Sequence, residues 1–148
     1  MRDRTREFLN EAKEIVSEVE ESNLLKTSRK IIVAPLYYAC YYCSLAMLYE
    51  LVPEVREKID AGAKIKHQGA LKYFHHYFIG KDQIYSLGYE CYDIYKNLLK
   101  ERERTSYECK QLLPSEISAH YAGTKTFLMT CLRVIQESDI DNEVYWER

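Results

Sequence analysis

Hydrophobic positions recur at steps of three and four along most of the chain, which is the spacing that places side chains on one face of a helix. One such stripe consists of Ile84, Leu87, Cys91, Ile94 and Leu98. It predicts a long helix over 85–107, with Asp82 as its N-cap. The next position of the stripe holds Arg102, so an always-charged guanidinium stands where the pattern requires an apolar side chain.

The same spacing predicts a helix over 4–22, a longer one over 26–52, a short one over 67–79 and a last one from Pro114. Pro35 lies inside the second of these, and it either kinks that helix or marks its true start. The expected core faces are Phe8, Ala12, Ile15 and Val19 in the first helix, Leu71, Phe74 and Phe78 in the short one, and Ile117, Tyr121, Thr124, Leu128, Cys131 and Ile135 in the last.

The stretches between these helices are polar. Residues 53–65 predict a charged connection with Gly62 in its weakest part, and 105–113 predict a loop. No alternating pattern indicates a strand, so we expect an all-α antiparallel bundle of four long helices and one short helix. Residues 1–138 form this bundle, and 139–148 form an acidic and aromatic tail that packs back on it or docks a partner.

The composition is that of one cytoplasmic domain. The 148 residues carry a net charge of −2, which excludes a global basic field for nucleic acid. No apolar run reaches the roughly 18 residues of a membrane span, and the first residues lack the apolar core of a signal peptide. The five cysteines are odd in number and are expected to be buried, reduced thiols rather than a disulfide framework.

Several familiar sites are missing from the sequence. The five glycines do not cluster into a phosphate loop, and no HExxH motif occurs. His75 and His76 are adjacent, so on a helix they point to different faces and do not chelate one ion. His120 is expected on the polar face of the last helix. We therefore expect neither a metal nor a cofactor.

Two residues remain as candidates for chemistry. Arg102 either forms a structural ion pair, ends its helix in water, or lines a site for an anion such as phosphate. His67 opens the short helix, where the helix dipole favours a neutral imidazole.

Tyrosine is unusually abundant, with fourteen copies. It fills core volume while keeping a polar hydroxyl, so a tyrosine-rich core can be wet at its edge or continue into an interface. The second helix is apolar almost all round its centre, which is typical of the middle of a bundle or of a dimer face. The candidate interface residues are Tyr37, Tyr38, Tyr41 and Tyr42.

The order of these features resembles the HEPN domains (higher eukaryote and prokaryote nucleotide-binding), which are small all-helical proteins. The similarity runs from about residue 5 to 137. It rests on a tyrosine-alanine-aromatic segment at 36–42, a histidine-x-glycine at 67–69, and an arginine that precedes Tyr107 at the end of a helix. A Ser-Glu helix start at 115–116 completes the pattern.

The resemblance implies a homodimer in which the arginine motifs of two subunits face one cleft. HEPN ribonucleases carry an arginine, four to six residues and then a histidine, and they cleave RNA without metal through the 2′-hydroxyl. Here Tyr107 stands in place of that histidine, and Ser106 replaces the aspartate of the closer subgroup. The residues expected to hold phosphate are Arg102, Arg104, Ser106, Tyr107 and His67, with Arg102 and Tyr107 as the catalytic pair if cleavage occurs.

Three functions follow, in this order. The first is an RNA- or nucleotide-phosphate-binding module of a toxin–antitoxin or phage-defence pair, with a minimal nucleotidyltransferase or another antitoxin as partner. The second is an active metal-independent ribonuclease toxin. The third is a non-catalytic dimerisation partner that uses its tyrosine-rich helix as an interface.

Overall fold

A computed structural model describes residues 1–22, 25, 30–80, 87–107 and 112–146, and for residues 30, 106, 107 and 140–146 it describes the backbone alone. Within these ranges the regular structure is helical, which confirms the all-α prediction. The elements are α1 (Asp3–Glu21), the short 3₁₀ helix η2 (Lys30–Ile32), α2 (Val33–Leu51), α3 (Pro53–Asp60), α4 (His67–Phe78), α5 (Tyr89–Tyr107) and α6 (Pro114–Trp146).

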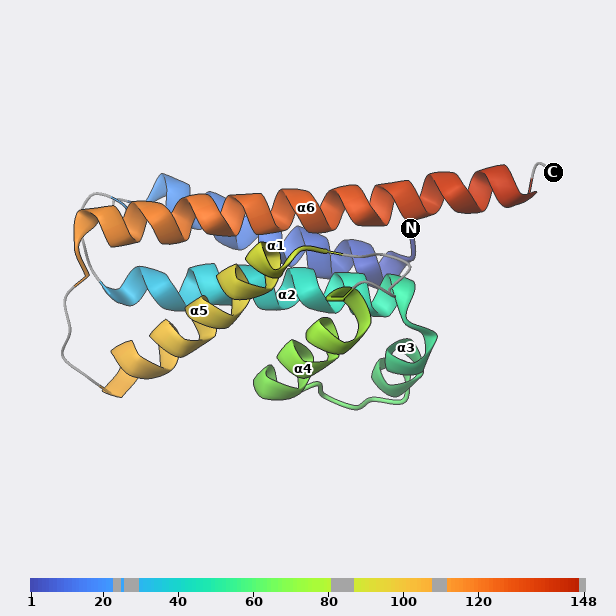
Figure 1. Cartoon of the computed structure of the whole chain (residues 1–148), viewed down its shortest axis with the longest axis horizontal. Helices are drawn as coiled ribbons and strands as arrows, with labels where there is room; N and C mark the ends of the chain where they lie inside the picture. The colour runs from blue at the N-terminus through green and yellow to red at the C-terminus, as the bar shows by residue number, and fades with distance from the viewer. Residues whose placement is uncertain (23–24, 26–29, 81–86, 108–111, 147–148) are drawn as a thin grey trace.

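Helix α2 is the central element. It contacts α1, α3, α4, α5 and α6 (Figure 1). Helices α1 and α6 run along α2, while α4 and α5 cover another side of it, and α5 also contacts α6. Burial on several sides explains why the sequence of α2 is apolar almost all round.

Proline sets the starts of two helices. Helix α2 begins at Val33, so Pro35 lies in its first turn, where a missing backbone N–H costs nothing. Of the two predicted outcomes for Pro35, it marks the start of the helix. Pro53 is the first residue of α3. The prediction of a connection over 53–65 was therefore wrong for its first part, because Pro53 and the acidic Glu54 after it favour a helix start that we overlooked.

Helices α4 and α5 differ from the prediction at their ends. Helix α4 stops before Gly80, whose φ of +136° is a left-handed conformation that glycine adopts without strain. Helix α5 begins at Tyr89 rather than at residue 85, and Leu87 before it forms a single bridge with Ile79. The predicted N-cap Asp82 lies outside the described residues. The helix continues to Tyr107, so the loop predicted from 105 is shorter.

Helix α6 starts as predicted and ends later. Pro114 is its first residue, and Glu116 accepts a hydrogen bond from the backbone N–H of Leu113 at 3.2 Å, which caps the first turn. The backbone then stays helical through Trp146. The segment from 139 that we set apart as a tail therefore continues α6 for most of its length.

The predicted core faces match the buried positions closely. Every residue predicted for α4 is buried, and in α6 the buried positions include Ile117, Thr124, Cys131 and Ile135. In α1 the predicted Phe8, Ala12 and Val19 are buried, whereas Ile15 is half-buried and its neighbour Val16 is buried instead.

The structure also bears on the predictions about cysteines and about membrane spans. Four cysteines, namely Cys40, Cys43, Cys91 and Cys131, are buried and free, and Cys109 lies outside the described residues. Among the helices that the structure describes, none is long and apolar enough to cross a membrane.

Tyr95 joins four helices in the core. Its fully buried ring, on α5, lies with its centroid 6.1 Å from that of Tyr37 on α2, 5.7 Å from that of Phe74 on α4 and 5.5 Å from that of Phe127 on α6. Its hydroxyl is 3.1 Å from the hydroxyl of Ser44. This junction fixes α5 against the rest of the fold.

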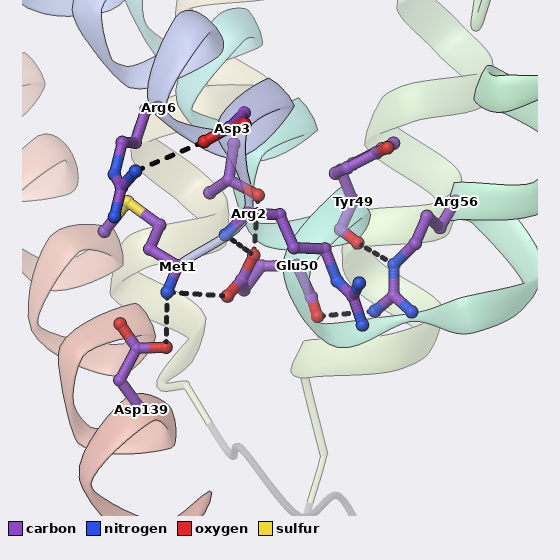
Figure 2. A network of polar contacts seen from close by, with 9 residues as sticks. Met1, Arg2, Asp3, Arg6, Tyr49, Glu50, Arg56 and Asp139 are labelled. Carbon is purple, nitrogen blue, oxygen red and sulfur yellow. Dashed lines mark hydrogen bonds and ion pairs between the residues drawn. The ribbon is translucent and has the colours of Figure 1, made fainter.

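A polar network ties α1 to the far end of α2 (Figure 2). The Glu50 carboxylate accepts hydrogen bonds from the Thr5 hydroxyl at 2.7 Å and the Arg2 amide at 3.1 Å. The amino group of Met1 lies 3.8 Å from Glu50 and 3.2 Å from Asp139 of α6. Three helices thus meet around one nearly buried carboxylate.

We expect Tyr95→Ala to lower the free energy of unfolding by about 3–5 kcal/mol, because it empties the centre of the aromatic junction. Tyr89→Ala removes the same ring from an exposed position of α5 and should change it by less than about 0.5 kcal/mol. Urea titration followed by circular dichroism measures both. Equal losses in the two variants would show that the junction is not central to stability.

Candidate phosphate-binding site

Arg102 lies against the tyrosine face of α2. Its guanidinium carbon is 5.1 Å from the ring centroid of Tyr37 and 5.0 Å from that of Tyr38, both within cation–π range. Its Nη2 donates a hydrogen bond to the Tyr38 hydroxyl at 3.1 Å. Arg102 reaches this face because it lies seven residues, two helical turns, after the buried Tyr95 on α5. The rings fix the guanidinium while leaving it half-buried.

His67 lies beside the same rings, although it belongs to α4. Its ring centroid is 5.4 Å from Tyr37, 5.6 Å from Tyr38 and 4.6 Å from Tyr41. Its Nδ1 shares a hydrogen bond of 2.6 Å with the Tyr37 hydroxyl. The fold therefore brings together Arg102 and His67, the two residues that the sequence suggested separately.

Burial and charge decide the protonation states. Burial lowers the pKa of His67, and the positive charge of Arg102 lowers it further. Burial raises the pKa of Tyr37 and of Tyr41. At neutral pH the site thus contains neutral imidazole and neutral phenols, and Arg102 supplies its positive charge. The neutral histidine was predicted from the helix dipole alone, and the sequence did not show the burial and the neighbouring Arg102 that also favour the neutral form.

Two contacts hold the segment that carries His67. The Tyr41 hydroxyl donates to the backbone carbonyl of Ile65 at 2.5 Å, two residues before His67. The Gln68 amide donates to the Glu103 carboxylate at 3.2 Å, which links α4 to α5 directly beside the site. Both contacts limit how far His67 can move relative to Arg102.

The structure separates Arg104 from Arg102. Arg104 is 3.4 Å from the Glu101 carboxylate and lines a cleft between α5 and α6, away from the tyrosine face. Residues two apart on a helix point in nearly opposite directions, so this separation could have been read from the sequence. Ser106 and Tyr107 belong to the last turn of α5, but their side chains lie outside the described residues.

The four predicted interface tyrosines do not act alike. Tyr37 is fully buried within the chain, so its ring offers no surface to a partner. Tyr38 and Tyr41 are half-buried beside His67. Tyr42 packs toward α1, with its ring centroid 6.5 Å from that of Phe8. We did not assign Tyr37, Tyr38 and Tyr41 to the phosphate site, although Tyr41 lies four residues after Tyr37 and three after Tyr38, spacings that place it beside each of them on α2.

This arrangement suits recognition of an anion. Arg102 offers N–H donors and a fixed charge, and Tyr38 adds a hydroxyl. The structure shows no hydrogen-bond partner for Nε2 of His67 among the described residues, so this nitrogen can bond to a ligand. It is a donor if Tyr37 donates to Nδ1, and an acceptor if Nδ1 carries the proton. Within the described residues, no group of three metal-binding side chains occurs.

We expect Arg102→Met to raise the pKa of His67, because the variant removes the positive charge that opposes protonation while the imidazole stays half-buried. The pKa should move toward the ordinary value of about 6.5. An NMR titration of the imidazole resonances measures the change. Arg104→Met removes the same charge from the other side of α5 and should leave the His67 titration close to that of the wild type. An unchanged His67 pKa in Arg102→Met would contradict the electrostatic influence of Arg102 on the imidazole.

Comparison with models of protein families, with curated proteins and with solved structures gave no match for this chain. The argument for the site therefore depends on its geometry and chemistry.

Proposed function

We propose that this chain is a HEPN-like helical bundle that binds a phosphate group of RNA or of a nucleotide at Arg102 and His67. One observation carries the proposal: a guanidinium fixed on two tyrosine rings lies beside a neutral histidine whose Nε2 can bond to a ligand. Arginine matches the geometry of phosphate oxygens, and half-burial strengthens a charge-assisted hydrogen bond.

RNA fits this site through its rings as well as its charge. Single-stranded nucleic acid is commonly bound by combining positive groups with aromatic side chains on which bases stack. Tyr38 and Tyr41 are half-buried beside Arg102 and keep part of their surface accessible. Because the net charge of the chain is −2, binding relies on this local arrangement rather than on a basic surface.

The resemblance to HEPN domains adds the biological setting. It supports a cytoplasmic homodimer that brings two arginine sites together, and a toxin–antitoxin or phage-defence pair in which a minimal nucleotidyltransferase or another antitoxin is the partner. In such a dimer the interface tyrosines are Tyr38, Tyr41 and Tyr42. The third reading, a purely structural dimerisation partner, predicts no ligand at Arg102.

Binding of a fluorescein-labelled single-stranded RNA tests the proposal. We expect Arg102→Met to weaken affinity by about tenfold to 100-fold, the loss of one charge-assisted hydrogen bond. Arg104→Met removes the same charge two residues away and should remain near the wild-type affinity. Fluorescence anisotropy at constant salt measures all three proteins, and wild-type affinity in Arg102→Met would overturn the proposal.

A second candidate function is metal-independent RNA cleavage, and the position of His67 favours it. Neutral imidazole can take the proton of a 2′-hydroxyl as its oxygen bonds to the neighbouring phosphorus. The bond from phosphorus to the 5′-oxygen then breaks, and the departing oxygen gains a proton from water. Arg102 offsets the charge that grows on the phosphate. In this mechanism His67 replaces the motif histidine whose position Tyr107 occupies.

If this second function holds, wild type cleaves RNA in the presence of EDTA, and His67→Gln lowers the rate about 100-fold or more. His76→Gln changes an exposed histidine of the same helix and should keep the wild-type rate. An oligonucleotide with 2′-O-methyl groups should stay intact, because it lacks the nucleophile. Cleavage that persists in His67→Gln would exclude this role, and no cleavage by wild type would leave binding as the function.

A further inference from the structure

A second candidate site lies on the opposite side of α5. A cleft of about 460 Å³ separates α5 from the first turns of α6. Its volume falls within the range of roughly 300–1,000 Å³ that is usual for small-molecule sites. Its lining residues are Asn97, Lys100, Glu101, Arg104, Glu116, Ala119 and His120. None of them belongs to the tyrosine-lined site of Arg102.

The charges of the cleft balance. Two cations, Lys100 and Arg104, line it together with two carboxylates, Glu101 and Glu116. Burial lowers the pKa of His120, so its imidazole adds no charge at neutral pH. The two carboxylates of the cleft would repel a phosphate-rich ligand, and its two cations would repel a polyamine. A ligand with one group of each sign suits the cleft better than either.

Glu101 offers a position for the cationic group of such a ligand. The Oε2 atom of Glu101 is buried and has no hydrogen-bond partner among the described residues, which is costly for a charged group. Its Oε1 atom accepts from Arg104 at 3.4 Å. A small rotation about the last side-chain torsion, which is soft in glutamate, would turn Oε2 toward the cleft, where an N–H donor could satisfy it.

Two cations of α5 offer a position for the anionic group of the ligand. Lys100 and Arg104 lie four residues apart, so they share one side of the helix, and Glu101 lies next to them. Lys100 is exposed, and the structure shows no ion pair for it among the described residues. Glu116 uses its Oε1 to accept from the Leu113 amide at 3.2 Å, so the second carboxylate is held in place by the start of α6.

We propose that this cleft binds a small zwitterion of the amino-acid type, with its ammonium group on the Glu101 carboxylate and its carboxylate on Lys100 and Arg104. Asn97 and His120 supply neutral hydrogen-bonding groups around the ligand. This site is separate from the proposed phosphate site, and it does not depend on the function proposed for Arg102.

Calorimetric titration of the full chain with each of the common amino acids tests the proposal. We expect at least one of them to bind, while acetate and methylamine, which each carry only one of the two charges, do not bind at the same concentration. Glu101→Gln preserves the shape of the side chain and removes its charge, and it should weaken binding at least tenfold. Lys100→Gln changes an exposed residue, so it should fold normally and weaken binding as well.

Two control variants separate this site from others. Lys96→Gln removes a charge one turn before Lys100, at a residue that does not line the cleft. The Nζ atom of Lys96 instead lies 5.6 Å from the ring centroid of Tyr92, so this variant should bind the amino acid like the wild type. Arg102→Met should also bind it normally even if it loses RNA. Absence of binding by every amino acid, or full binding by both Glu101→Gln and Lys100→Gln, would overturn the proposal.

Discussion

A buried tyrosine must find a hydrogen-bond partner for its hydroxyl, and this requirement organises the structure around α2. Packing other helices around α2 buries its tyrosine rings, which stabilises the fold. Each tyrosine hydroxyl that is buried without a hydrogen-bond partner would cost about 1–3 kcal/mol of that stability. Tyr37 bonds to His67, Tyr38 to Arg102 and Tyr41 to the carbonyl of Ile65. The candidate phosphate site is the edge of the core where these needs are met by an arginine and a histidine.

The helices could largely be predicted because their hydrophobic spacing is strong. The positions of Phe74 in α4 and of Ile117 in α6 follow from that spacing alone. Helix α3 was missed because it is only eight residues long and mostly charged, and Val55 is its buried residue, so it has almost no periodicity to detect. The late start of α5 was missed because the stripe continues backward through Leu87, which is buried but precedes the helix.

The candidate site was only half predictable. Arg102 was identified because it interrupts an apolar stripe, and His67 because it opens a helix. Their proximity depends on how α4 and α5 pack against α2, and spacing within one helix carries no information about that. The role of Tyr37 was misjudged for a related reason: a tyrosine in an apolar helix can face a partner chain or its own core, and tertiary packing decides between them.

The segment 101–104, Glu-Arg-Glu-Arg, shows how neighbouring helices give similar residues different chemistry. Side chains two apart on α5 project to opposite sides, so Arg102 meets the tyrosine rings of α2 while Arg104 meets Glu101 and the first turns of α6. On the first side the guanidinium is fixed by rings and lowers the pKa of His67. On the second side the cleft is lined by as many cations as carboxylates, so their charges cancel. One turn of helix thereby contributes to the candidate anion site and to a mixed-charge cleft. The packing of α2 and α6 determines which residue belongs to which.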